Sequence, residues 1–493
     1  MSVEPDTLII GAGMGGLSAA ITARAAGAHV RVYDALSAPG GKVGVGRTQD
    51  GVEFDTGPSL LTMIDTLDEV FRAGGTSLEQ ELTLVAPEPL FRYIYADDTT
   101  LDVYHDVGRT TDSVRQVYGG AAAKEFEAFL AYSKGIWEAA LPNFVQGEAP
   151  NYTSALVMGV TKFRQVLKVD PFRSMWEGIC KHVSHPHLRM LLARYATYNG
   201  SNPYQAPATL NCIAWVEMGL GGWGIEGGMA ELARALERVG RRMGVEFVYD
   251  TPVEQILLGA RQRVSGVRLE DGARVDARRL IVNADATHLL EDLLPARTRH
   301  DIPAVSDRSM SGWTGVMKAP AAHDRRAAHT VLFPHDYTKE FEDIFDLQRP
   351  PEQPTVYMCD QTQSHKRSGW PDANPVFVMA NAPPQHSEDL SRASKYDALE
   401  QTVEQTLKTR GFWGPQAQWV WKRRPIDLAR QFRGSYGSIY GASSNSQTAA
   451  FKRPPNEVKK IPGLFLASGS AHPGGGVPMC VMSGQTAARA MMR

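Results

Sequence analysis

The sequence predicts an α/β fold: a parallel sheet built from both ends of the chain, with a second, mixed α/β domain inserted between them. Two observations predict it. Near the start, an apolar run over 7–10 enters a glycine-rich turn, and a small-residue helix over 17–26 and a second apolar run over 30–34 follow. Near the end, an apolar run over 464–467 enters a second glycine-rich stretch and a helix over 477–492. Strand, turn, helix and strand in this order form a parallel βαβ unit, so both ends should join one sheet.

The composition fits a globular protein of two domains. The chain has 493 residues, of which 43% are hydrophobic and 22% are charged, and this length exceeds one ordinary core. The formal net charge is −2, and no block of like charges stands out, so we expect no nucleic-acid partner. We find no stretch of about 18 apolar residues and expect no spanning helix. Residues 1–6 carry two acids and no basic region, which argues against a secretory signal.

The first glycine-rich turn predicts a dinucleotide site. Gly11, Gly13 and Gly16 match G-x-G-x-x-G between the first expected strand and the first expected helix. In this pattern the first glycine permits the tight turn, the second lets the backbone approach a pyrophosphate, and the third lets helix and strand pack closely. The helix N-terminus would add free N–H groups and a partial positive charge. Asp34 ends the next strand, where a carboxylate can accept hydrogen bonds from ribose hydroxyls.

A second match to the pattern, at Gly219, Gly221 and Gly224, is not expected to bind a nucleotide. The run over 214–218 before it is poor strand sequence, and no helix opens at Gly224. Without a strand and a helix the spacing carries little information. We therefore expect no separate NAD site.

Two further elements follow the first turn. Gly40, Gly41 and Lys42 come soon after Asp34, and residues 55–59 have the sequence Asp-Thr-Gly-Pro-Ser. With these elements the chain resembles the glutathione-reductase-like flavoproteins, in particular the branch shared by amine oxidases and carotenoid desaturases. The resemblance implies a Rossmann-type FAD-binding domain with FAD as the cofactor. It also implies that both elements line the FAD, which gives these candidates: Gly40, Gly41, Lys42, Gly57, Pro58, Ser59 and Leu60.

The stretch over 464–478 resembles the terminal motif of bacterial carotenoid desaturases, where the strand end and the loop approach the flavin. The resemblance implies that the last helix begins near the pyrimidine end of the flavin, where its dipole would stabilise negative charge on the reduced ring. Related flavoproteins often have Gly-Asp where this chain has Gly469 and Ser470, and this departure fits the carotenoid branch better than the amine oxidases. The candidates here are Gly469, Ser470, Val477, Pro478 and Met479 for the cofactor and His472 for catalysis.

The middle of the chain completes both domains. The resemblance places Val253 near the adenine and Asp285 at the end of a strand beside the cofactor. We expect an FAD-binding domain of residues 1–90, 220–300 and 440–493, and a mixed α/β substrate-binding domain of residues 91–219 and 301–439. The other expected elements are a mostly helical segment over 68–209, a helix over 229–243, strands over 245–249 and 279–284, and a hairpin of 264–269 with 273–275.

The inserted segments indicate a branch of the family. Residues 194–198, 329–334, 376–383 and 441–445 look like carotenoid desaturases, and most of all like the 1-hydroxycarotenoid 3,4-desaturases, also called methoxyneurosporene dehydrogenases. The resemblance implies FAD-dependent 3,4-desaturation of an acyclic 1-hydroxy or methoxy carotenoid by hydride transfer to the flavin. Oxygen or a quinone would then reoxidise the flavin. Sister enzymes that act on phytoene or diapophytoene are close alternatives.

Three rival functions share this fold. A flavin amine oxidase needs an aromatic cage and usually the Gly-Asp ending, so Ser470 argues against it. A carotenoid isomerase keeps the mass of its substrate, whereas a desaturase removes two hydrogens. A non-catalytic prenyl-binding protein, like the Rab escort and GDP-dissociation-inhibitor proteins, needs no flavin, and the intact glycines at both ends disfavour it.

A lipid-soluble polyene resides in the bilayer, so we expect a cytoplasmic enzyme bound peripherally to the inner membrane. The helical insertion over 130–169 offers Trp137, Phe144, Phe163 and Val166 as contacts, although core packing explains such residues equally well.

Two further groups of side chains carry no predicted chemistry. His182, His185 and His187 lack a carboxylate or cysteine that would complete a metal site, so no metal is expected. The cysteines Cys180, Cys212, Cys359 and Cys480 are widely spaced, which favours free thiols.

Overall fold

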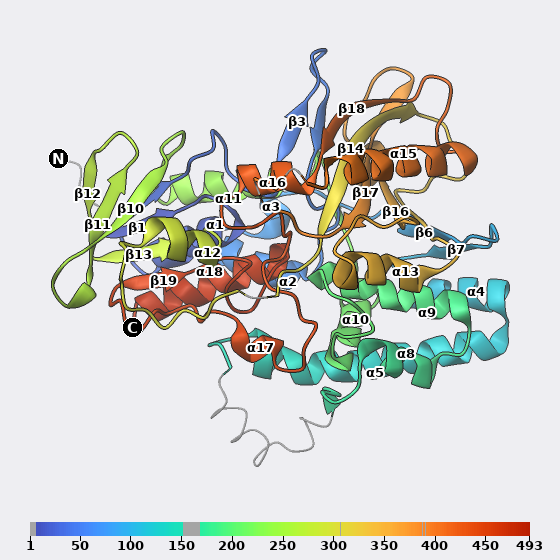
Figure 1. Cartoon of the computed structure of the whole chain (residues 1–493), viewed down its shortest axis with the longest axis horizontal. Coiled ribbons are helices and arrows are strands. Elements are labelled where there is room, and N and C mark those ends of the chain that lie inside the picture. Colours follow the sequence, from blue (N-terminus) through green and yellow to red (C-terminus); the bar gives the residue numbers. More distant parts are fainter. Residues whose placement is uncertain (1–5, 151–167, 306, 387, 390) are drawn as a thin grey trace.

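Both ends of the chain join one parallel sheet. The computed structural model describes residues 6–150, 168–305, 307–386, 388–389 and 391–493 (Figure 1). The sheet has the strand order β19-β13-β1-β2-β9. Its strands are β1 (Thr7–Ile10), β2 (Val30–Tyr33), β9 (Glu246–Val248), β13 (Arg279–Val282) and β19 (Leu464–Leu466). All four pairings are parallel, so the predicted α/β arrangement is confirmed.

Close helix packing holds the two ends of the chain together. Helix α1 (Met14–Ala25) lies against α18 (Val477–Met491), and α2 (Ile64–Ala73) and α11 (Ala230–Arg242) pack beside them. Ser18 Oγ donates to the carbonyl of Val481 at 2.8 Å. A Cβ at Gly484 would lie 2.9 Å from the Ala19 nitrogen. The small residues in both helices therefore permit an approach that larger side chains would prevent.

Helix α1 begins earlier than the sequence suggests. The expected start at residue 17 is wrong, because Gly13 is the N-cap, with extended backbone, and the helix runs on from Met14 through two glycines. Gly16 thus lies in the first turn, where an added Cβ would collide with the carbonyl oxygen of Gly11. Gly27, with φ of 95°, follows the end of the helix.

An antiparallel sheet flanks the parallel one. It consists of β10 (Val253–Leu258), β11 (Val264–Leu269) and β12 (Arg274–Asp276). The predicted hairpin is confirmed, since β11 pairs antiparallel with β12 around a turn at Gly272, whose φ is 88°. Two short ladders complete this part of the chain: β3 (Val45–Arg47) with β4 (Glu53–Asp55), and β5 (Leu84–Val85) with β8 (Gly224–Ile225).

The second large sheet has seven strands, which pair in both parallel and antiparallel directions. Its order is β18-β14-β17-β16-β15-β6-β7. The strands are β6 (Phe91–Ile94), β7 (Thr100–Val103), β14 (Ser311–Pro320), β15 (His329–Leu332), β16 (Val356–Asp360), β17 (Ala373–Ala382) and β18 (Gln418–Arg423). The expectation of a mostly helical 68–209 is wrong for 84–103. There, an aromatic and β-branched run, Phe-Arg-Tyr-Ile, precedes a turn with Asp98 in the left-handed region, which is a hairpin pattern.

Helices enclose this mixed sheet. Tyr396, Leu399, Val403 and Leu407 of α15 cover one face, and Figure 1 shows α4, α5, α8, α9 and α10 gathered on the other side. The helices are α4 (Val107–Tyr118), α5 (Gly120–Ala140), α8 (Met175–His182), α9 (Pro186–Ala193), α10 (Cys212–Met218), α13 (Tyr337–Phe341), α14 (Gln361–His365), α15 (Ala393–Thr409) and α16 (Pro425–Gln431). Short helices complete the list: α3 (Leu78–Glu81), α12 (Ala286–His288), α17 (Ala449–Lys452), and single turns at Leu141–Val145, Arg194–Asn199, Ala208–Asn211, Ala260–Gln262, Leu289–Leu293 and Glu342–Asp346.

Within the described ranges, no helix is long and apolar enough to cross a membrane.

The second G-x-G-x-x-G match follows helix α10 rather than a strand, and Gly224 opens the two-residue strand β8. The expectation that this match lacks the strand–turn–helix context is therefore confirmed. The four cysteines are free thiols, as expected.

Candidate cofactor and substrate site

Three strand ends meet at one edge of the parallel sheet. Because β1, β13 and β19 are adjacent and parallel, their carboxyl ends place Gly11, Asn283 and Ala467 side by side. Asn283 Nδ2 donates to the carbonyl of Ala467, and an added Cβ at Gly13 would lie 2.6 Å from Asn283 Oδ1. Asn283 therefore requires glycine on the first turn. Sequence reasoning placed this residue at a strand end but did not assign it to the site.

Two helix N-termini open at the same edge without a capping side chain. Among the described residues, neither Gly13 at the start of α1 nor Gly476 at the start of α18 receives a side-chain cap. Gly476 has a φ of 109°, and nothing lies within 4 Å of the position a Cβ would take. Uncapped N–H groups and the positive ends of two helix dipoles favour an anionic group. The edge therefore fits a pyrophosphate at α1 and a ring that gains negative charge at α18.

Asp34 lies at the end of β2 beside the first turn. Its carboxylate accepts from the backbone nitrogens of Ala12 at 2.6 Å and Leu36 at 2.7 Å. These two bonds leave acceptor positions on both oxygens, since a carboxylate has about four. Burial raises the pKa of Asp34 above its ordinary value. Val253, at the start of β10, is half-buried and follows closely after Thr251, whose backbone nitrogen donates to the Asp34 carbonyl at 2.9 Å. Asp34 and Val253 both stay cofactor candidates.

The Gly-Gly-Lys element folds back on the first turn. The Gly40 nitrogen donates to the Ala12 carbonyl at 2.9 Å, and both glycines have positive φ, 116° and 58°. Lys42 Nζ donates to the carbonyls of Ser438 at 2.9 Å and Ile439 at 3.0 Å. Burial lowers the pKa of Lys42. The Lys42 side chain therefore ties the Gly-Gly-Lys element to a distant loop.

The second element, 55–59, links the cofactor edge to the mixed sheet. Asp55 accepts from the Met229 nitrogen and pairs with Arg367, each at 2.8 Å. An added Cβ at Gly57 would collide with the Lys42 carbonyl oxygen. Ser59 Oγ lies 2.5 Å from the Tyr357 hydroxyl on β16. Pro58 and Leu60 are half-buried beside it. The loop over 55–59 thus connects the Gly-Gly-Lys element to strand β16 of the mixed sheet.

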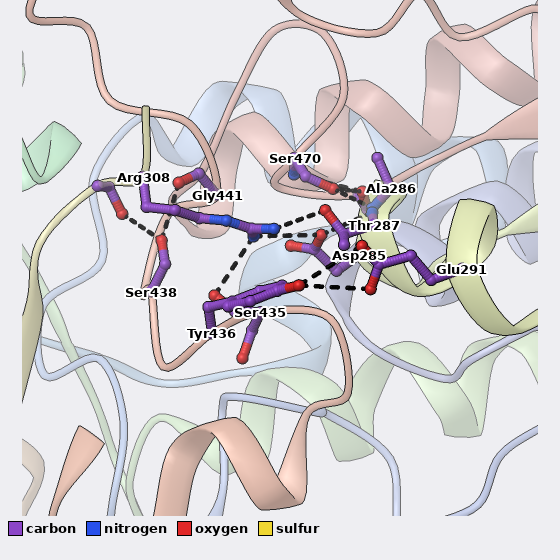
Figure 2. A network of polar contacts seen from close by, with 12 residues as sticks. Asp285, Ala286, Thr287, Glu291, Arg308, Ser435, Tyr436, Ser438, Gly441 and Ser470 are labelled. Carbon is purple, nitrogen blue, oxygen red and sulfur yellow. Dashed lines mark hydrogen bonds and ion pairs between the residues drawn. The ribbon is translucent and has the colours of Figure 1, made fainter. Parts of the chain in front are cut away.

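A polar network fixes the loop that carries Ser470 (Figure 2). Asp285 caps the Thr287 nitrogen at 2.9 Å and pairs with Arg308 at 3.5 Å. Ser470 Oγ accepts from the Ala286 nitrogen at 2.8 Å. Arg308 also donates to Thr287 Oγ1 at 2.5 Å. The Asp285 and Ser470 side chains therefore hold the loops of the cofactor edge together. Arg308, which sequence reasoning missed, has no local pattern that would have identified it.

His472 is buried behind the glycine loop. It is 2% exposed, and its Nε2 has no hydrogen-bond partner in the described part of the chain. Burial, with the nearby Arg453 cation as the second cause, lowers the pKa of His472 to about 4. The imidazole is therefore neutral at pH 7. Gly469 lies in the same loop, and Val477, Pro478 and Met479 form the half-buried first turn of α18.

Three tyrosines beyond the cofactor candidates have partly buried side chains. Tyr198, Tyr357 and Tyr440 keep part of their surface accessible, although the surrounding protein raises their pKa values by burial. Leu60, from the cofactor loop, and the Tyr198 and Tyr357 rings pack against one hydrophobic cluster. The loop over 55–60 and two of these tyrosines therefore border the same apolar cluster, which includes strands of the mixed sheet.

The remaining candidates have ordinary surroundings. Trp137 is 9% exposed and packs with α10 and α18, and Phe144 is half-buried. Phe163 and Val166 lie outside the described residues. Among the histidines, His182 stacks on Tyr132, while His185 and His187 pack around Tyr118 and Tyr95. No cluster of three metal-binding side chains occurs in the described ranges.

The comparisons identify what this chain is similar to. The model of the "flavin containing amine oxidoreductase" family matches residues 14–492. The hydroxyneurosporene desaturase of Rubrivivax gelatinosus is 32% identical over 98% of this chain and 93% of its own length, and that of Rhodobacter capsulatus is 34% identical over 100% and 98%. A solved putrescine oxidase double mutant has a TM-score of 0.61 at 15% identity over 99% of both chains, a likeness that shows the fold alone. The chain therefore belongs to the flavin-containing amine oxidoreductase family, in the carotenoid desaturase branch that includes the hydroxyneurosporene desaturases.

Proposed function

We propose that this protein is an FAD-dependent desaturase that introduces a C=C bond at the 3,4 position of an acyclic 1-hydroxy or methoxy carotenoid. One observation carries the proposal: similarity to two proteins named hydroxyneurosporene desaturases covers the inserted domain as well as the cofactor edge. The inserted domain is the part that would bind the substrate, so its similarity bears on the substrate class. A desaturase of phytoene or diapophytoene is the second candidate.

The cofactor edge fits FAD in its residues. Gly11, Gly13 and Gly16 would admit the pyrophosphate at the start of α1, and Asp34 would accept from the adenosine ribose. Further contacts would come from the two later elements and the C-terminal loop: Gly40, Gly41, Lys42, Gly57, Pro58, Ser59, Leu60, Val253, Asp285, Gly469, Ser470, Val477, Pro478 and Met479. The observation that supports this fit is the pair of uncapped helix N-termini behind glycine turns. When bound, FAD supplies a two-electron acceptor for hydride.

The chain's own residues would position the substrate and manage charge. The dipole of α18, with 15 residues, would favour negative charge near Gly476. The half-buried rings of Tyr198, Tyr357 and Tyr440 would hold the polyene in one orientation and exclude water. Loss of a hydride from one carbon and of a proton from its neighbour forms the new C=C bond. His472, whose buried Nε2 has no described partner, is our candidate for accepting that proton.

The reduced cofactor would pass its electrons to oxygen or a quinone. The enzyme would take its substrate from the cytoplasmic face of the inner membrane. Phe172 supports a membrane surface. It lies beside the expected insertion, in the loop before α8, and is 74% exposed. Sequence reasoning named other aromatic residues and missed this one.

Coexpression with single acyclic carotenoids tests the proposed function. We expect a product two hydrogens lighter, with absorption shifted to the red, from a 1-hydroxylated polyene. An unchanged mass with an altered chromatographic position would indicate an isomerase instead, and unchanged polyenes in every case would refute desaturation. The variant Gly13→Val should lose bound flavin and activity together, because the added side chain would collide with Asn283 Oδ1. If it retains flavin, the placement of the dinucleotide turn is wrong.

A further inference from the structure

A buried charged cluster lies between the mixed sheet and helix α10. Arg194 Nη2 donates to the Tyr93 hydroxyl at 2.7 Å and lies 3.9 Å from Glu217. Tyr195 donates to Glu217 Oε1 at 2.6 Å, and Tyr198 donates to the other oxygen, Oε2. The guanidinium also lies 4.9–5.5 Å from four aromatic ring centres. Both charges are therefore neutralised and held in one geometry.

Stability does not explain a cluster of this kind. The Arg194 and Glu217 side chains are 9% and 1% exposed, so both ions are almost fully desolvated. A buried ion pair is often no more stabilising than apolar residues of similar volume. Its neighbours are aromatic and aliphatic side chains of one hydrophobic cluster, including Leu60 from the cofactor loop. A polar group kept in such surroundings points to recognition of something polar.

Among the described tyrosines of this cluster, Tyr198 is the one whose side chain keeps accessible surface, since Tyr93 is 0% exposed. Tyr195 is 0% exposed, whereas Tyr198 is partly accessible. Because the Tyr198 O–H donates to Glu217, its oxygen can only accept further bonds. Arg194 Nη2 approaches that oxygen at 3.4 Å, and one lone pair is left. Among the described tyrosines of the cluster, Tyr198 therefore offers the hydroxyl acceptor on a side chain with accessible surface.

We propose that Tyr198, held by Glu217 and Arg194, accepts a hydrogen bond from the hydroxyl group at the end of a hydroxylated polyene. The inference rests on the proposed function and deepens it, because it assigns the residue that distinguishes an alcohol from a hydrocarbon. The surrounding apolar side chains take the rest of the chain. An alcohol can donate to Tyr198, whereas a methyl ether and a hydrocarbon cannot. The enzyme should therefore prefer the hydroxylated polyene to its methoxy counterpart and to the parent hydrocarbon.

The test is the substrate preference of the flavin-loaded enzyme. We would measure kcat/KM for a matched set of 1-hydroxy, 1-methoxy and unsubstituted acyclic polyenes, with wild type and Tyr198→Phe. Wild type should prefer the alcohol by about tenfold, the ratio expected for one hydrogen bond in a desolvated site. In Tyr198→Phe the preference should fall to within about twofold, through loss of activity on the alcohol and with little change for the hydrocarbon.

Tyr195→Phe is the matched control. It removes a hydroxyl from the same Glu217 carboxylate, but from a ring with no accessible surface. This variant should keep the preference for the alcohol, whatever it does to both rates together. A preserved preference in Tyr198→Phe would overturn the proposal. So would its loss in both variants, because the cluster would then act only through the fold.

The same data separate the two proposals. A wild-type enzyme that desaturates alcohol and hydrocarbon equally well overturns the Tyr198 assignment and leaves the desaturase function standing. A wild-type enzyme that desaturates none of the three polyenes overturns the desaturase function, and the Tyr198 assignment with it.

Discussion

Asn283 shows how one side chain determines the residues opposite it. Its amide donates to the Ala467 carbonyl, and its backbone and Oδ1 lie against Gly11 and Gly13. An added Cβ at Gly11 would lie 2.9 Å from the Asn283 carbonyl oxygen. The glycines of the first turn are therefore required by contact with β13 as well as by the approach of a pyrophosphate. Close packing against β13 therefore requires the same glycines that the dinucleotide pattern contains.

Glu340 is a buried acid whose titration should govern stability near neutral pH. It is 0% exposed and accepts from the Thr355 nitrogen at 2.9 Å and from Asn381 Nδ2 at 2.7 Å. Burial nevertheless raises its pKa to about 7. Because the folded pKa exceeds the unfolded one of about 4.3, this group stabilises the fold below pH 4, and that stability is lost as pH rises through 7.

The variant Glu340→Gln should flatten this dependence. Between pH 5 and pH 8 the wild-type free energy of unfolding should fall relative to the variant by on the order of 2 kcal/mol. Urea denaturation at several pH values measures the difference. Glu342→Gln, an exposed neighbour on the same turn, is the control and should follow the wild-type curve. Parallel curves for wild type and Glu340→Gln would show that Glu340 does not titrate in this range.

At the scale of elements, the contact of α1 with α18 should control flavin binding. Gly484 lies in α18, where an added Cβ would meet Ala19 at 2.9 Å and Gly15 at closer range. Gly484→Ala should therefore push the helices apart and shift the first turn, with a loss of about 1–3 kcal/mol in stability and a lower flavin content. Absorbance at the flavin band and thermal unfolding measure the two effects.

A second helical glycine gives the matched control. Gly135 lies in α5, and nothing occupies the 4 Å around its missing Cβ. Gly135→Ala should stabilise the protein slightly, because alanine is the better helix former by about 1 kcal/mol. If both alanine variants behave alike, the effect comes from helix propensity and not from the α1–α18 contact.

The elements that the sequence predicts well are those with a local signal. Four of the five strands of the parallel sheet are mostly buried apolar runs, whereas β9 (Glu-Phe-Val) has a single buried residue. The sequence predicts each of the five within two residues of its ends. The strands over 84–103 were missed because they lie in a long segment that is otherwise helical. Helix α1 was begun late because its two glycines suggest a turn, although the contact with Gly11 makes them necessary.

Side chains contributed by distant segments could not be predicted in this way. Arg308 reaches Thr287 and the loop at Ser435, and Lys42 reaches Ser438 across 396 positions of the chain. Tyr357 meets Ser59 across 298 positions. No local spacing encodes such contacts, since they depend on how the two sheets are placed. The glycine motifs were visible in the sequence because the backbone conformation they serve is local.

At the scale of the whole molecule, the fold places a polar sheet edge, which we propose binds the cofactor, beside an apolar layer, which we propose binds the substrate. The parallel sheet gathers strand ends, glycine turns and two helix N-termini, whereas the mixed sheet and its helices present tyrosines and aliphatic side chains. The loop over 55–60 belongs to both, through Asp55 on Met229 and Ser59 on Tyr357. Hydride transfer requires such a boundary, because a charged cofactor and a hydrocarbon must meet with water excluded.

The same requirement predicts a contact with the membrane. Substitution of Phe172 tests this prediction. A polyene enters from a bilayer, so the entrance should carry exposed apolar surface. Phe172 is 74% exposed, and its carbonyl accepts from Gln447 Nε2 at 3.0 Å, so the ring is exposed on an anchored backbone. Phe172→Ser should weaken flotation of the flavin-loaded protein with liposomes several-fold and leave its melting temperature unchanged. Leu347→Ser, which removes another exposed apolar side chain at 58% exposure, should float like wild type. Equal losses in both variants would mean that adsorption follows total apolar surface, and full flotation of Phe172→Ser would place the entrance elsewhere.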